Sequence, residues 1–206
     1  MENRGVFISL EGIDGAGKTT LKNHLLEHLR EQGYNAIDIR EPGGTALSEK
    51  IRDLLLDSQN DTMTVITEAL LYAAARSQLV EEVIRPALKE GKVVIADRYI
   101  DSTMAYQGYG RGLDQGLLAQ LNQLSTGGLK PQLTLLLDLD PETGLKRRRG
   151  DSDRMEMTGY SFQSRVRTGY LHIAEKEPDR IKVLDARKPP DQLLTESMAY
   201  ILNRLQ

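Results

Sequence analysis

The chain has no cysteine, and this absence excludes two kinds of architecture. Among its 206 residues there is no thiol, so neither a disulfide framework nor a cysteine-based metal site can form. A strong charge excess is also missing. The formal net charge is −3, which supplies no overall basic field for a nucleic-acid polymer. No nucleic-acid partner is therefore expected.

Long hydrophobic runs are missing as well. No apolar stretch is long enough to span a bilayer, and the first residues lack the apolar region of a signal peptide. There is no internal repeat and no low-complexity segment. The length suits one α/β domain with a sizeable core, so a single domain over residues 1–206 is predicted, with no membrane partner and a cytoplasmic location.

Strand and helix signals alternate along the chain. Two of the predicted strands are near-continuous apolar runs, which is typical of strands that are covered on both faces. The predicted strands are Val6–Glu11, Ala36–Arg40, Val93–Asp97, Leu133–Leu139 and Ile181–Asp185. The predicted helices are Thr19–Gln32, Ala46–Leu56, Met63–Glu90, Gln115–Leu124, Pro141–Arg149, Phe162–Glu177 and Pro190–Leu205.

This alternation predicts a five-stranded parallel sheet with helices on both faces. Ligands of such sheets bind at the carboxyl ends of the strands. Pro86 lies inside a helical pattern and is expected to kink or split that helix. The polar, glycine-rich stretch 102–112 follows a strand and is expected to be a functional loop.

A glycine-rich motif follows the first predicted strand and matches the phosphate-binding loop pattern G-x-x-x-x-G-K-[ST]. Glycines let the backbone curl so that its N–H groups point at phosphate oxygens. Lys18 is placed to reach the terminal phosphates, and the Thr19 hydroxyl is placed to bind Mg²⁺. The nucleoside triphosphate is therefore expected to contact Gly12, Ile13, Asp14, Gly15, Ala16, Gly17, Lys18, Thr19 and Thr20.

Two more charged stretches fall at the expected ligand edge of the sheet. Asp97 ends a buried strand, where P-loop proteins place a second carboxylate for Mg²⁺, and Arg98 follows it beside the transferring phosphoryl group. The segment 40–45, which contains Glu41, Pro42 and two glycines, reads equally as a shaped binding loop or an ordinary turn.

Other candidates are weaker by themselves. Tyr72 and Arg76 are four residues apart on one helix face, and spacing alone favours a core tyrosine with a surface arginine. Arg52 alone reads as a solvated charge that is able to point back at the cleft. The basic run 146–149 reads either as a solvated helix end or as part of a lid over residues 147–160, and the lid is favoured in a chain with a P-loop.

Taken together, these stretches resemble the thymidylate kinase family over residues 6–185, nearly the whole chain. The P-loop alone indicates only a nucleotide-binding protein, whereas the Asp-Arg-Tyr stretch with its Tyr-Gln-Gly tail is more specific. The resemblance rests on residues 11–20, 40–45, Tyr72 with Arg76, Asp97-Arg98-Tyr99 with Ser102, Ala105-Tyr106-Gln107-Gly108, and Asp153-Arg154 with Glu156.

The resemblance implies transfer of the ATP γ-phosphoryl to thymidine monophosphate (dTMP), giving the diphosphate for dTTP synthesis, with Mg²⁺ as the metal. It implies that Lys18, Arg98, Arg149 and Arg154 act on the transferring phosphate and that Thr19 and Asp97 serve the metal, Asp97 through water. The implied dTMP contacts are Asp14 at the sugar end, Glu41 and Arg52 near the acceptor, Tyr72 on the thymine ring, Arg76 at O4, Thr103 and Gln107 at N3, Tyr106 at the sugar, and Arg98 at the phosphate.

Three further points follow from the resemblance. Some family members carry an arginine at the position of Gly15, and members without it supply one from the lid, as the basic run here suggests. The stretch 186–189 matches an adenine-side loop, and family members are commonly homodimers.

Three alternatives stay open. A deoxynucleoside kinase would need a carboxylate base beside a substrate hydroxyl, a role that Glu11 is able to fill. Another nucleoside monophosphate kinase would differ in the base pocket. A regulatory GTPase or a P-loop protein without turnover is a third possibility, although no Asn-Lys-x-Asp guanine-reading segment is present.

Overall fold

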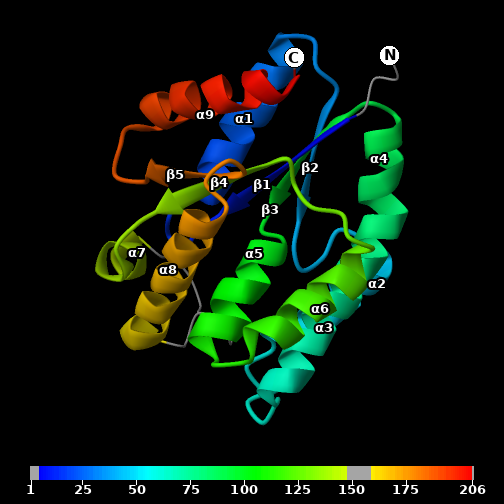
Figure 1. Cartoon of the computed structure of the whole chain (residues 1–206), viewed down its shortest axis with the longest axis vertical. Coiled ribbons are helices and arrows are strands. Elements are labelled where there is room, and N and C mark those ends of the chain that lie inside the picture. Colours follow the sequence, from blue (N-terminus) through cyan, green and yellow to red (C-terminus); the bar gives the residue numbers. More distant parts are fainter. Residues whose placement is uncertain (1–4, 148–158, 206) are drawn as a thin grey trace.

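The computed structural model describes residues 5–147 and 159–205 and shows one parallel sheet (Figure 1). Its strand order is β2-β3-β1-β4-β5, with every neighbouring pair parallel. The strands are β1 (Val6–Glu11), β2 (Ala36–Arg40), β3 (Val93–Asp97), β4 (Leu133–Asp138) and β5 (Ile181–Asp185). The predicted five-stranded parallel sheet is confirmed, and the fourth strand ends one residue earlier than expected.

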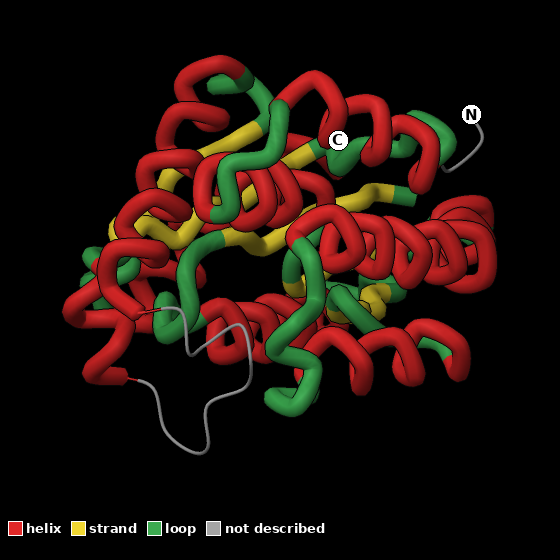
Figure 2. Tube along the Cα trace, turned by 90° about the horizontal axis from the view of Figure 1, so that it is seen from below, coloured by secondary structure: helices red, strands yellow, loops and turns green. Residues whose placement is uncertain are grey.

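Helices cover both faces of this sheet (Figure 2). Helix α1 lies beside α9, while α2, α3 and α6 gather on the opposite side of the molecule (Figure 1). The helices are α1 (Lys18–Glu31), α2 (Ala46–Leu56), α3 (Val65–Leu79), α4 (Arg85–Lys89), α5 (Ile100–Thr103), α6 (Gln115–Thr126), α7 (Pro141–Arg147), α8 (Gly159–Lys176) and α9 (Pro190–Leu205), with π-helices η1 (Val80–Ile84) and η2 (Met104–Gly110).

Alternation along β3 explains why the sheet is covered on both faces. Val93 and Ile95 join the apolar cluster that contains residues of α1, α8 and α9. Val94 and Ala96 join a second cluster with residues of η1 and α4. Because successive side chains of a strand point to opposite faces, a continuous apolar run supplies both clusters at once.

The long helix expected over 63–90 is interrupted as predicted. It is α3, then the π-helix η1, then α4, in one continuous path. Pro86 has no N–H with which to bond the Glu82 carbonyl, and the wider π-turn lies immediately before it.

The expectation that 102–112 forms a loop is wrong. Residues 100–110 are helical, first as α5 and then as η2. The glycines there permit close packing: a Cβ on Gly110 would lie 2.8 Å from the Phe162 ring on α8. Glycine therefore indicates close helix packing in this stretch.

A buried ion pair joins α5 to the residue that precedes the edge strand β5. Arg180, just before β5, donates from both terminal nitrogens to the Asp101 carboxylate at 2.8 Å. The same guanidinium donates to Thr134 on β4. The Arg180 and Asp101 side chains are 12% and 4% exposed, so neither charge has water to replace its partner.

We expect Arg180→Met to lower the free energy of unfolding by about 3 kcal/mol, because it leaves Asp101 charged and buried without its cation. Urea unfolding measures the change. The matched control is Arg187→Met, which breaks a two-bond arginine–aspartate pair whose side chains are 72% and 37% exposed. Water replaces that pair, so the control should unfold like the parent. Equal effects of the two substitutions would contradict the role given to Arg180.

Candidate active site

A cleft of about 880 Å³ opens at the carboxyl ends of the strands. It brings together most of the predicted site residues, which come from six separate stretches of chain. Those that line it are Asp14, Gly15, Ala16, Gly17, Lys18, Thr19, Thr20, Glu41, Arg52, Tyr72, Arg76, Asp97, Arg98, Thr103, Tyr106 and Gln107. Gly12 and Ile13 belong to the same loop but do not line the cleft, and Arg149 and Arg154 lie outside the described residues.

The predicted P-loop joins β1 to α1. Gly12 has φ 139° and lies so close to β4 that a Cβ there would be 2.5 Å from the Leu137 carbonyl oxygen. The Lys18 ammonium is folded onto this loop and donates to the carbonyl oxygens of Gly12 and Ile13 at 3.0 Å. Burial, followed by the nearby charge of Arg98, lowers the pKa of Lys18 to about 8. An anion bound in the loop would favour the charged form.

The loop leaves no room for a side chain at its second glycine, Gly15. Gly15 has φ 80°, and a Cβ there would collide with the Gly144 carbonyl oxygen on α7. The loop and α7 therefore touch backbone to backbone, which requires glycine at both positions.

Two oxygen donors face each other beside the loop. The Thr19 hydroxyl donates to Asp97 Oδ2 at 3.4 Å, and both residues line the cleft. Mg²⁺ prefers oxygen ligands and in nucleotide sites takes only one or two from protein. In residues 5–147 and 159–205 there is no group of three or more acidic or histidine side chains placed to hold a metal. This donor set therefore fits a magnesium ion that takes its other ligands from phosphate and water.

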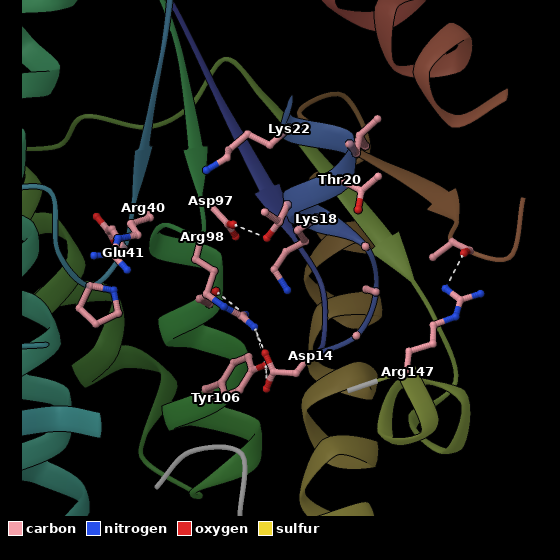
Figure 3. Close-up of a pocket in the computed structure, with 18 of the residues that line it drawn as sticks. Asp14, Lys18, Thr20, Lys22, Arg40, Glu41, Asp97, Arg98, Tyr106 and Arg147 are labelled. Carbon is pink, nitrogen blue, oxygen red and sulfur yellow. Dashed lines mark hydrogen bonds and ion pairs between the residues drawn. The ribbon is translucent and has the colours of Figure 1, made fainter. Parts of the chain in front are cut away.

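Arg98 lies at the centre of the cleft with an unusual backbone. Its φ is 73°, the only positive value among the described non-glycine residues. Its guanidinium forms an ion pair with Asp14 and donates to the Tyr106 hydroxyl at 3.0 Å (Figure 3). The guanidinium carbon also lies 4.8 Å from the centre of the Tyr106 ring, which is a cation–π contact. Such a backbone persists only where its surroundings hold it, and here it turns a cation toward the P-loop.

The sequence did not predict the partners that hold Arg98 from behind. Arg98 Nη1 donates to the Tyr170 hydroxyl at 3.2 Å and the Ser102 hydroxyl at 3.3 Å. Both hydroxyls donate to Glu11 Oε2, at 2.8 and 2.6 Å. Tyr170 is on α8 and far away in the chain, so no local pattern could have revealed this link.

Glu11 itself is fully buried and does not line the cleft. Its carboxylate accepts hydrogen bonds from the Tyr99 N–H, Ser102 and Tyr170. Burial, followed by the nearby charge of Asp101, raises its pKa to about 7. A carboxylate enclosed in this way is not placed to take a proton from a substrate hydroxyl, which disfavours the deoxynucleoside kinase alternative.

Arg76 is buried, contrary to the expectation of a surface arginine, and Tyr72 is the half-buried member of the pair. The guanidinium pairs with Glu41 through two nitrogens, at 2.7 and 2.6 Å. It also donates to Thr103, Asn122 and the Tyr99 carbonyl at 2.8, 2.9 and 3.0 Å. The ion pair with Glu41 makes it possible to bury the charge of Arg76. Residue spacing along one helix cannot reveal such a partner, because Glu41 lies on another segment of the chain.

Four of these contacts are hydrogen bonds, one from Nε, two from Nη1 and one from Nη2, and the second contact to Glu41 is an ion-pair contact of Nη2. A guanidinium has five N–H groups, so most of those of Arg76 are already used within the protein. Arg52 is also less solvated than expected, since it is half-buried and donates to the Pro42 carbonyl at 2.9 Å. Of the segment 40–45, Arg40, Glu41 and Pro42 line the cleft.

The other end of the cleft carries residues from the last third of the chain. Arg147 at the end of α7 donates to the Ala186 carbonyl at 3.2 Å (Figure 3). Lys188 and Pro190 line the cleft beside Ala186, so the predicted loop 186–189 does reach the site. None of the described helices is long and apolar enough to cross a membrane.

A P-loop beside a cation-lined cleft, on a five-stranded parallel sheet, defines a kinase of the nucleoside monophosphate kinase class. Comparisons with known proteins narrow this class. The family model described as Thymidylate kinase matches residues 10–196. Thymidylate kinase of Geotalea uraniireducens (strain Rf4) is 47% identical, with 98% of each chain covered, and that of Deinococcus radiodurans is 50% identical, again with 98% of each.

A solved structure agrees with these relatives. The crystal structure of thymidylate kinase from Ehrlichia chaffeensis superposes with a TM-score of 0.79 at 37% identity, over 96% of this chain and 99% of that one. The chain belongs to the thymidylate kinase family, and it is an enzyme, a kinase.

We expect Glu11 to make stability fall as pH rises. Between the ordinary pKa of 4.5 and about 7, the folded protein keeps a proton on Glu11 that the unfolded chain has lost. From pH 5 to pH 8 this contributes a loss of about 2 kcal/mol in unfolding free energy, which Glu11→Gln should remove. Urea unfolding of both proteins at the two pH values measures the difference. Parallel pH profiles for parent and variant would show that Glu11 does not titrate in this range.

Proposed function

We propose that the chain transfers the γ-phosphoryl group of ATP to the 5′-phosphate of dTMP, giving dTDP for dTTP synthesis. The observation that carries the proposal is the convergence of Lys18, Arg98 and Arg52 on one cleft while Glu11 is enclosed behind it. Phosphoryl transfer between two anions needs alignment and cations more than a base. A phosphorylated acceptor is already anionic at the oxygen that attacks.

The donor end of the cleft suits ATP. The amides of residues 12–20 and the ammonium of Lys18 bind its phosphates, which compete with the carbonyl oxygens that Lys18 now contacts. Thr19 and Asp97 would hold Mg²⁺, Asp97 through water, and a bound ion would supply positive charge beside the phosphates. The loop 186–189 is the adenine side.

The acceptor end suits a pyrimidine nucleotide. Tyr72 stacks on the thymine ring, and Tyr106 lies against the sugar. Thr103 and Gln107 meet the N3 edge. Arg98 binds the acceptor phosphate, with Asp14 as its ion-pair partner. Glu41 and Arg52 line the same end of the cleft. Arg76 holds Thr103 and Glu41 in place, and the same guanidinium is the group that meets thymine O4.

We further propose that this is the kind of family member whose lid supplies the arginine. The collision at Gly15 supports it, since an arginine at that position does not fit against Gly144. Residues 148–158 lie outside the described structure, so the lid over 147–160 and the roles of Arg149 and Arg154 stay predictions. Arg147, which reaches Ala186 across the cleft mouth, is the described end of that basic run.

The decisive assay measures ADP release from ATP and Mg²⁺ with dTMP, deoxyuridine monophosphate (dUMP), deoxycytidine monophosphate (dCMP) or thymidine as acceptor. Turnover should be strong with dTMP and negligible with thymidine. Arg98→Ala should lower kcat with dTMP by about 10³-fold or more, because it removes a cation that faces the transferred group. The control is Arg204→Ala on the exposed face of α9, which should match the parent. Turnover with thymidine but not dTMP would refute the proposal.

We also propose that the chain forms a homodimer through α2, α3 and α6. These helices are neighbours, and together they expose seven large apolar side chains, each at least 37% exposed: Leu47, Leu54, Val65, Ile66, Leu70, Leu117 and Leu124. In the described part of the chain the other large exposed apolar residues are Tyr160 and Val183. Exposed apolar side chains gathered on neighbouring helices mark an interaction surface, and a second copy carries the same surface.

Light scattering after gel filtration tests the dimer. The parent should have twice the chain mass, and Leu70→Glu should give a monomer, because it buries a charge at the centre of the interface. Val183→Glu, which places the same charge on an exposed apolar site of β5, is the control and should stay dimeric. A monomeric parent would refute this part of the proposal and leave the catalytic part standing.

A further inference from the structure

Gln107 lines the acceptor end of the cleft, and its side chain is oriented from behind. The amide nitrogen, Nε2, donates to Glu68 Oε1 at 2.9 Å. Glu68 is on α3, is 1% exposed, and does not line the cleft. Any influence of Glu68 on a bound base is therefore exerted through Gln107.

Glu68 is itself held by a cation on its far side. Arg111 donates from Nε to Glu68 Oε1 at 3.3 Å and from Nη2 to Oε2 at 3.0 Å. The same guanidinium lies over the Phe162 ring of α8, 5.0 Å from its centre. A carboxylate with two contacts to one guanidinium is fixed in direction and is an acceptor only.

This arrangement decides which atom of the Gln107 amide turns to the cleft. An ionised carboxylate accepts from N–H but cannot donate to a carbonyl, so Nε2 must face Glu68. The amide is planar, so the position of Oε1 is then fixed as well. None of the described residues donates to Oε1, and Oε1 is not among the fully buried polar atoms that lack a partner. It is therefore an acceptor that a ligand in the cleft is able to reach.

We propose that Glu68 is a specificity-positioning residue: with Arg111 it locks the Gln107 amide so that Oε1 accepts a hydrogen bond from the base. This inference rests on the proposed function. Thymine and uracil carry a hydrogen on N3 and satisfy Oε1. Cytosine has an unprotonated N3, so two acceptors would face each other with no hydrogen between them, which disfavours that base.

The test compares kcat/KM for dTMP and dCMP in Glu68→Gln and in a matched control. The control is Glu82→Gln: the exposed Glu82 also accepts from a glutamine amide, that of Gln78 at 2.7 Å, but away from the cleft. In Glu68→Gln the amide of Gln107 is free to flip and present N–H to cytosine N3. The dTMP-over-dCMP ratio should fall at least tenfold, and the ratio of Glu82→Gln should match the parent.

A swapped variant separates this role from general stability. Glu68→Gln combined with Gln107→Glu keeps the charge beside Arg111 and restores an acceptor-only side chain at position 107. It should recover the preference for dTMP over dCMP. If Glu68→Gln keeps the parental ratio, or if it fails to fold and the swapped variant shows no preference, the proposal is overturned. A parent that does not phosphorylate dTMP would instead refute the proposed function, so the two failures are distinguishable.

Discussion

The parallel pairing of β1 with β3 is the constraint on which the site depends. Leu10 is opposite Asp97 in this register, and the Arg98 N–H bonds the Leu10 carbonyl at 3.0 Å. The P-loop leaves β1 at the same level at which Asp97 and Arg98 leave β3. Since parallel strands end at one edge, two segments that lie 78 residues apart at Thr19 and Asp97 deliver a phosphate cradle, a metal carboxylate and a cation to one place.

A second theme is the pairing of buried charges behind the cleft. Arg76 with Glu41 and Arg98 with Asp14 pair residues that line the cleft, whereas Arg111 with Glu68 lies behind Gln107, which lines it. Burial of one such charge alone would be strongly unfavourable, so each pair holds its members in one geometry. The side chains that meet the ligand are thereby directed before it arrives, which limits the reorganisation that binding requires.

The helix after β3 shows that tertiary packing can override the backbone conformation that the local sequence favours. Its polar and glycine-rich sequence favours a loop, yet Tyr106, Gln107 and their neighbours form α5 and η2 against α8. A rigid helix carries Tyr106 and Gln107 more accurately than a loop would. A π-helix frequently marks a functional site, and here it presents its side chains toward the acceptor end.

The sequence by itself determined the class of fold, the bounds of most strands, the P-loop and the strand-end acid, because these depend on periodicity and on short motifs whose chemistry is local. Only the tertiary structure decided that Arg76 is buried, that Glu11 is enclosed by Ser102 and Tyr170, and that Glu68 orients Gln107. Each of these facts depends on a partner from a distant segment. Hydrogen bonds and ion pairs between such segments have no period in the sequence, so the fold must first bring the partners together.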